Sequence, residues 1–159
     1  QIFFTQIGGF DTHSGPINGQ AGLLTQVSQA INAFFLATVE LGQQDKVTLF
    51  TMSDFSRTLQ PSGSGADVGS DHAWGNNHMI VGGSVLGNAL YGTYPNLTPG
   101  GPNDTDGGSS PRGRWIPSTS VEQYAATLAT WYGLSSADLS AVFPLIGRFA
   151  TPNLGFLSP

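Results

Sequence analysis

The chain has 159 residues, a formal net charge of −5 and only 9% charged residues. The chain has one lysine and few arginines, of which only Arg112 and Arg114 lie close together in the sequence. This balance argues against nucleic acid and anionic membrane surfaces as partners, because phosphate binding needs larger clusters of positive charge. Cysteine is absent from the sequence, so thiolate catalysis and cysteine zinc sites are excluded. No apolar run reaches the length of about 18 residues that a membrane helix requires, and the length is that of one domain.

The first third of the chain has the pattern of strand, helix and strand. Residues 2–7 form an apolar run that predicts a strand buried on both faces. Apolar residues between 19 and 41 recur every three or four positions, which predicts an amphipathic helix that ends at Gly42. Residues 47–52 predict a second buried strand. Two strands joined by a helix favour a parallel βαβ unit with a right-handed crossover.

Loops and a hairpin are predicted next. Residues 56–70 and 95–111 are rich in Gly, Ser, Pro and Asp and predict surface loops. Between them, residues 78–85 and 89–94 predict two short strands that form a hairpin around the turn at Gly87-Asn88.

The last third of the chain predicts helices. Thr119 and Glu122 form a capping box at the start of a helix that ends at Gly133. Residues 135–142 predict one further short helix, and we expect the apolar tail from residue 143 to pack against the domain. The fold class is therefore α/β, with a parallel βαβ core, a β-hairpin and C-terminal helices, in a single domain over residues 1–159.

The few acidic and histidine side chains are expected to converge. Asp11 and His13 follow the first predicted strand, Asp54 follows the second, and His72 and His78 flank a flexible segment after it. Binding residues gather beyond the carboxyl ends of parallel strands, and residues i and i+2 of an extended chain point to one side. Asp11 and His13 can therefore share an ion with a third ligand from Asp54, His72 or His78. An open mixed site of oxygen and nitrogen suits Zn²⁺, with Mn²⁺ or Fe²⁺ as alternatives.

Other interpretations of these residues stay open. Asp11 can cap the turn while His13 bonds a backbone carbonyl. Asp54 can form a structural ion pair with Arg57 instead of taking part in catalysis. His78 begins an apolar strand and fits a structural role.

The aromatic and basic residues also have two interpretations. Trp74 fits packing or the lining of a pocket. Arg112 and Arg114 fit either an anion site or salt bridges between a loop and the surface.

Six motifs run in order along the chain, from Phe4 to about Phe156: "GGFDTH", "FTMSDFSRTL", "DHAWGNNHMIVGG", "YGTYP", "RGRWIPSTSVEQYAATLATWYG" and "VFP". With these motifs the chain resembles the C-terminal half of a large bacterial family known as domain of unknown function 1501. That family is often exported and is considered a distant relative of the alkaline phosphatase and sulfatase superfamily.

The superfamily resemblance implies the C-terminal part of an α/β/α sandwich with metal ligands at the carboxyl ends of its strands. By this resemblance Asp11, His13 and His72 are the ligands of one metal site, and Asp54 belongs to an Asp-His pair of a second. Two departures count against two metals: Asp11 and His13 are closer in sequence than in alkaline phosphatases, and Phe55 stands where the second site's His is expected. One metal, or none, is the expectation.

Candidate roles follow from these patterns. Asp54 and Arg57 are the catalytic candidates, and Trp74, His78 and Arg114 are the candidates for substrate binding. The superfamily's nucleophile lies near the start of its fold, and the chain opens at Gln1 almost inside a strand. We therefore expect a longer polypeptide, a missing N-terminal half as the principal partner, and no turnover by this part alone.

Two functions remain open. The first is an exported, periplasmic or extracellular, metal-dependent hydrolase homologue that acts on small phosphate or sulfate esters. The second is a catalytically inactive extracellular protein, structural or glycan-binding, with the same fold. The aromatic content, the uncharged surface rich in Asn and Thr, and Phe55 favour the second.

Overall fold

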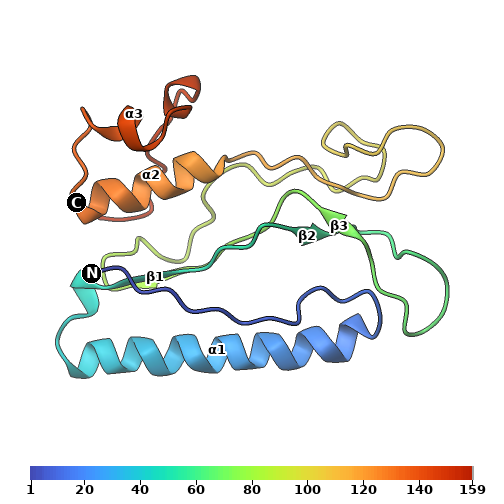
Figure 1. Ribbon diagram of the computed structural model, residues 1–159, viewed down its shortest axis with the longest axis horizontal. Helices are drawn as coiled ribbons and strands as arrows, with labels where there is room; N and C mark the ends of the chain where they lie inside the picture. Colours follow the sequence, from blue (N-terminus) through green and yellow to red (C-terminus); the bar gives the residue numbers. More distant parts are fainter. Residues whose placement is uncertain (159) are drawn as a thin grey trace. The chain divides into compact units, whose positions relative to one another are not determined.

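The computed structural model describes residues 1–158 (Figure 1). The chain divides into two compact units, each made from three separate stretches. The first unit comprises residues 1–34, 53–76 and 96–116, and the second unit comprises residues 35–52, 77–95 and 117 onwards. The fold is mixed α/β, with helices and small antiparallel sheets.

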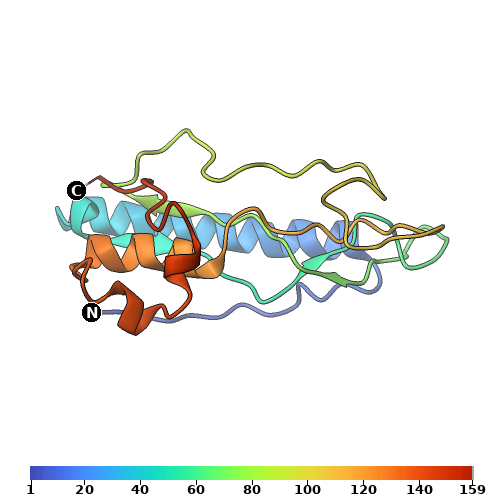
Figure 2. The same cartoon turned by 90° about the horizontal axis from the view of Figure 1, so that it is seen from above.

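The long helix α1 spans Pro16–Glu40 and is continuous (Figure 2). Proline is favoured in the first turn of a helix because its fixed φ suits the helix and its missing N–H has no partner there. The helix is followed by Gly42 with a φ of 63°, as the sequence predicts. By length and composition alone α1 can cross a membrane, and one such helix near the N-terminus is weak evidence for a span.

The second unit contains the strands β1 (Thr48–Phe50) and β4 (Ile80–Gly82), which pair antiparallel. The strand expected in residues 47–52 is confirmed, but its partner differs from the expected one. Residues 2–7 form no strand, so the prediction of a parallel βαβ unit is wrong. An apolar run forms a strand only where another segment makes backbone hydrogen bonds with it. Among residues 1–158, no segment forms a β-ladder with residues 2–7.

The predicted hairpin is also absent, because β4 pairs with β1 and residues 89–94 form no strand. Asn88 lies in the left-handed region with a φ of 58°, and the chain bends there without forming the predicted hairpin turn. The chain after β4 instead makes an isolated antiparallel bridge between Val85 and Leu157.

Helix α2 (Val121–Tyr132) confirms the predicted helix and its end at Gly133, where φ is 111°. Its capping box is formed one residue later than predicted, by Ser120 and Gln123. Ser120 and Gln123 make both hydrogen bonds of the capping box, and the predicted pair of Thr119 and Glu122 does not form it.

Short helical turns complete the second unit: η1 (Gln44–Lys46), α3 (Leu139–Val142) and η2 (Ile146–Arg148). The apolar tail packs as predicted, since Phe156 is only 1% exposed and contacts the rings of Tyr91 and Tyr124.

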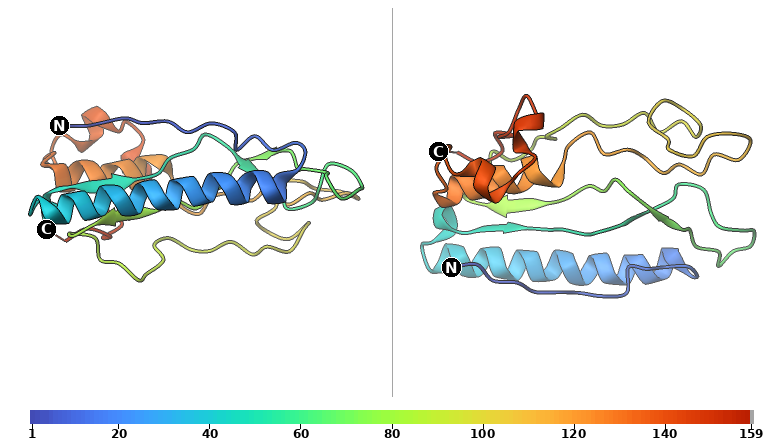
Figure 3. Two further views of the ribbon diagram at one scale, coloured as in Figure 1. Left: turned by 90° about the horizontal axis from the view of Figure 1, so that it is seen from below. Right: turned by 45° about the horizontal axis from the view of Figure 1, so that its top comes forward.

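The first unit contains β2 (Ser56–Arg57) and β3 (His72–Ala73), which also pair antiparallel. β2 lies inside the segment expected to be loop. Residues 96–116 form a long loop that doubles back on itself (Figure 3), closed by a bridge between Asp104 and Trp115.

Candidate metal centre

Two side chains of the centre are brought together by the pairing of β2 with β3. Arg57 and His72 are direct partners in this register, and directly opposed residues of antiparallel strands project to the same face. Both reach one oxygen of Asp11: Oδ1 lies 2.5 Å from Arg57 Nη1 and 2.8 Å from His72 Nε2. The alternative ion pair of Arg57 with Asp54 is therefore not the one formed.

His13 is placed by a second backbone pairing, which joins residues 13–15 to residues 67–69. Ser14 and Val68 form an isolated antiparallel bridge, and the Gly69 N–H donates to the His13 carbonyl at 3.0 Å. A Cβ atom on Gly69 would lie 2.2 Å from the Thr12 carbonyl oxygen, so this close approach requires glycine. His13 Nε2 then lies 2.8 Å from Asp11 Oδ1.

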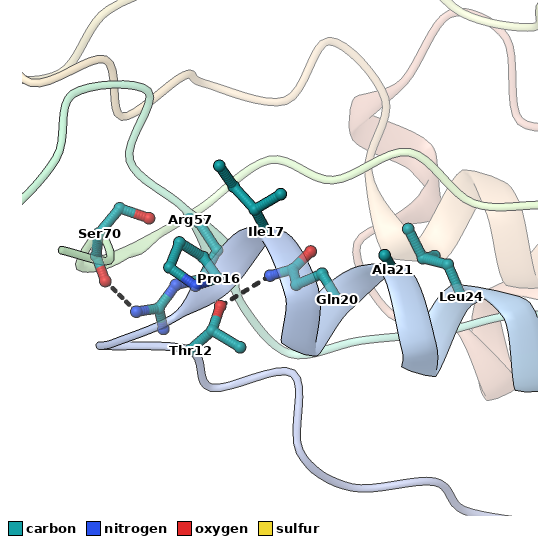
Figure 4. A pocket seen from close by; sticks show the side chains of 8 residues that line it. All are labelled: Thr12, Pro16, Ile17, Gln20, Ala21, Leu24, Arg57 and Ser70. Carbon is teal, nitrogen blue, oxygen red and sulfur yellow. Dashed lines mark hydrogen bonds between the residues drawn. The ribbon is translucent and has the colours of Figure 1, made fainter. Parts of the chain in front are cut away.

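The turn between Asp11 and His13 is fixed by α1. Thr12 is 8% exposed, and its Oγ1 accepts a hydrogen bond from Gln20 Nε2 at 2.9 Å (Figure 4). Arg57 is held from the other side, because its Nη2 donates to the Ser70 carbonyl (Figure 4). These residues line a hollow of about 450 Å³ together with Pro16, Ile17, Ala21 and Leu24.

The geometry gives three ligand atoms for one ion. The carboxylate oxygen of Asp11 and the ring nitrogens of His13 and His72 all lie within 4.8 Å of one another, and all three side chains are exposed. The two contacts of 2.8 Å to Asp11 are shorter than the spacing of about 3.3 Å between ligand atoms around tetrahedral zinc. An ion at this position would require a small outward shift of these exposed side chains, with solvent as its remaining ligands.

Aromatic stacking fixes the ring of His72. The ring of Phe55 stacks on it with centroids 4.5 Å apart and an interplanar angle of 14°. The ring of His13 stacks on it as well, at 5.5 Å and 23°. Phe55 thus supports the ring of His72.

The electrostatics of the cluster favour an ionised carboxylate. The hydrogen bond from His72 is the largest cause that lowers the pKa of Asp11; burial opposes it, and Arg57 and the charge of His13 add to the lowering. A carboxylate that stays ionised in mildly acidic solution is ready to bind a cation. The same contacts mean that the guanidinium of Arg57 already neutralises Asp11, and a metal ion has to compete with it.

The remaining candidate residues of the first unit lie outside the three-ligand cluster. Asp54 is exposed and does not belong to it. Trp74 is 68% exposed and donates from Nε1 to Thr105 Oγ1 at 3.2 Å. Arg114 pairs with Asp106 at 2.6 Å and donates from Nε to the His72 carbonyl at 3.0 Å. Arg114 therefore supports the backbone of β3.

His78 belongs to the second unit. Its ring lies 5.7 Å from that of Tyr124, and burial lowers the pKa of His78. His78 is exposed and precedes β4, which begins at Ile80, so it does not begin the strand as predicted.

Sequence reasoning missed three residues that shape the cluster: Gln20, Gly69 and, in its stacking role, Phe55. The roles of Gln20 and Gly69 depend on contacts with a distant turn, and local sequence gives no sign of them.

The family model described as "Protein of unknown function (DUF1501)" matches residues 1–104. The chain belongs to this family. No curated protein and no solved structure matches this chain.

Proposed function

We propose that Asp11, His13 and His72 bind one divalent metal ion, with Zn²⁺ as the first choice and Mn²⁺ or Fe²⁺ as alternatives. The observation that supports this most is the approach of three ligand atoms to within 4.8 Å on one exposed surface. One carboxylate and two imidazoles with positions left to solvent are the ligand set of catalytic zinc sites. Such an ion polarises an ester oxygen and stabilises developing negative charge.

The proposed function is that of an exported metal-dependent hydrolase homologue acting on phosphate or sulfate esters. Arg57 supports it, because its guanidinium lies at the cluster, is 14% exposed and stays tied to the Ser70 carbonyl. A planar cation held in this way can bind an ester's anionic oxygens. The superfamily relation and export are part of the proposal and rest on resemblance.

The proposal includes a missing N-terminal half of the same protein, which would supply the nucleophile. Support comes from exposed apolar side chains in the first unit: Ile2, Phe3 and Phe4 are 80%, 83% and 86% exposed. Contiguous apolar surface of this kind is a feature of surfaces that another segment or partner covers. We expect no turnover from this chain alone.

Metal analysis of the purified protein tests the proposal. After loading with Zn²⁺ and removal of excess ion, we expect one equivalent in the wild type and a large loss in the Asp11→Ala/His13→Ala variant. Asp54→Ala is the matched control, because it removes an exposed carboxylate outside the cluster. Equal, substoichiometric zinc in all three proteins removes the metal proposal.

A second candidate function is an inactive glycan-binding or structural protein. Two observations favour it: Arg57 already pairs with Asp11 at 2.5 Å, and Trp74 is 68% exposed, so its apolar surface is open to a ligand. Glycan-array binding that is lost in Trp74→Ala and kept in Asp11→Ala/His13→Ala supports this function over the hydrolase.

A further inference from the structure

Asp71 lies beside the cluster without belonging to it. Its Oδ1 is 3.9 Å from Nδ1 of His13, the ring nitrogen that faces away from Asp11. Asp71 also directly precedes His72, so one short segment provides both the ligand candidate His72 and a carboxylate that faces His13. The proposed metal centre of Asp11, His13 and His72 does not include the carboxylate of Asp71.

Asp71 is held firmly in place. Ser62 Oγ donates to its Oδ1 at 2.8 Å, and Arg112 Nη1 lies 2.5 Å from its Oδ2. Its backbone is fixed to Thr58 in both directions, because the Thr58 N–H donates to the Asp71 carbonyl at 2.8 Å and the Asp71 N–H donates to Thr58 Oγ1 at 3.1 Å. A half-buried carboxylate with this many partners is an ordered hydrogen-bond acceptor.

The two ring nitrogens of His13 face different carboxylates. In the present structure Nε2 lies 2.8 Å from Asp11 Oδ1 and has a proton to donate. A metal ion at Nε2 needs that nitrogen without its proton, so the proton of the neutral ring must sit on Nδ1. Nδ1 faces Asp71.

We propose that Asp71 is a positioning residue that accepts the Nδ1–H of His13 when Nε2 binds the metal ion. The distance of 3.9 Å exceeds a direct hydrogen bond, and rotation of the His13 ring, whose side chain is 53% exposed, closes it. Ser62 and Arg112 keep the carboxylate in place for this contact. The inference rests on the proposed metal centre. Histidine ligands of metals typically donate their second N–H to such a carboxylate, which sets the tautomer and the ring orientation.

Zinc affinity tests this role through the variant Asp71→Asn. Asp67→Asn is the matched control, because Asp67 is an exposed aspartate of the same segment and its loss changes the net charge equally. With competition against a chromophoric chelator, we expect Asp71→Asn to bind Zn²⁺ about 10- to 100-fold more weakly than Asp67→Asn. Asp71→Glu, which restores the carboxylate, is expected to recover part of this loss.

The tautomer of His13 gives a readout that general destabilisation does not move. Long-range ¹H–¹⁵N NMR spectra of the zinc-loaded wild type should show the proton of His13 on Nδ1, and this signal should weaken or exchange rapidly in Asp71→Asn. The other histidines report in the same spectrum whether the variant is folded.

The outcomes separate the two proposals. If the wild type binds no zinc through Asp11 and His13, the metal centre itself fails. If the wild type binds zinc there while Asp71→Asn and Asp67→Asn have equal affinity and the same His13 spectrum, the metal centre stands and the positioning role of Asp71 is overturned.

Discussion

The two units are stabilised in different ways. Every ion pair among residues 1–158 lies in the first unit, whose buried residues include the apolar Ala73 and the polar Thr12 and Thr58. In the second unit, the apolar residues Ala126, Ile146 and Phe156 are buried together with the polar Thr38, Gln123 and Thr127. Ion pairs therefore distinguish the first unit, and large buried apolar side chains distinguish the second. Changes of charge, metal or pH should therefore alter the first unit, and the removal of buried side chains should lower the stability of the second unit.

The largest expected effect is a cavity in the second unit. Phe156→Ala removes a ring that is 1% exposed and should lower the free energy of unfolding by about 3–5 kcal/mol, measured by urea denaturation. Leu90→Ala, at a side chain of the same unit that is 85% exposed, should change it by at most about 0.5 kcal/mol. Equal effects of the two variants would contradict the assignment of the core.

The next effect is a steric clash in the first unit. Gly69→Ala places a Cβ atom 2.2 Å from the Thr12 carbonyl oxygen, so the backbone that positions His13 must move. We expect a loss of about 1–3 kcal/mol in stability and the loss of zinc binding, measured by denaturation and by metal analysis. Gly107→Ala is the control, since its Cβ would meet nothing within 4 Å. Retained zinc in Gly69→Ala would show that this pairing does not position His13.

A smaller effect concerns the start of α2. Ser120→Ala removes the side chain that accepts from the Gln123 N–H at 3.1 Å, and it should cost about 1 kcal/mol of unfolding free energy. Thr119→Ala alters the residue that the sequence pattern suggested as the cap, and it should leave this hydrogen bond intact. If thermal denaturation shows a larger loss of stability in Thr119→Ala than in Ser120→Ala, then Thr119 is the helix cap.

The smallest effect is a dependence on pH in the loop of residues 96–116. Burial opposes the ionisation of Asp104, but backbone N–H groups of Gly100, Asp106, Arg114 and Gly113 donate to its carboxylate and lower its pKa below the usual 3.8. A lowered pKa stabilises the folded loop fully above the pKa of the unfolded chain. This stabilisation is lost as the pH falls below about 3.8 through the pKa of the folded state.

Amide NMR signals of Gly100 and Gly113 measure this dependence. In the wild type they should shift as the pH falls below 3.8, and in Asp104→Asn the shift should be absent. Identical titrations of the two proteins would show that another carboxylate is responsible.

The sequence predicted the features that depend on neighbouring residues. The periodicity of α1 and the glycines at 42 and 133 are local signals, and the structure confirms the helices that they indicate. Strand pairing is not local: the apolar run at residues 2–7 has the composition of a buried strand, yet the partner of β1 is β4, far along the chain.

The approach of Asp11, His13 and His72 was expected for a different structural reason. The prediction relied on the ends of parallel strands, whereas the structure uses the antiparallel pairing of β2 with β3 and the bridge between Ser14 and Val68. The scarcity of charged side chains made these residues conspicuous whatever the topology. Gln20 and Gly69 escaped notice because their contacts with the turn of residues 11–13 join segments that are distant in the sequence.

X-ray absorption spectroscopy of the zinc-loaded protein tests the central claim most directly. We predict two histidine nitrogens at about 2.0–2.1 Å and a carboxylate oxygen at about 2.0–2.2 Å from the ion, with the histidine signal reduced in Asp11→Ala/His13→Ala. A spectrum with oxygen ligands alone, unchanged in that variant, would show that Asp11, His13 and His72 do not form a metal centre.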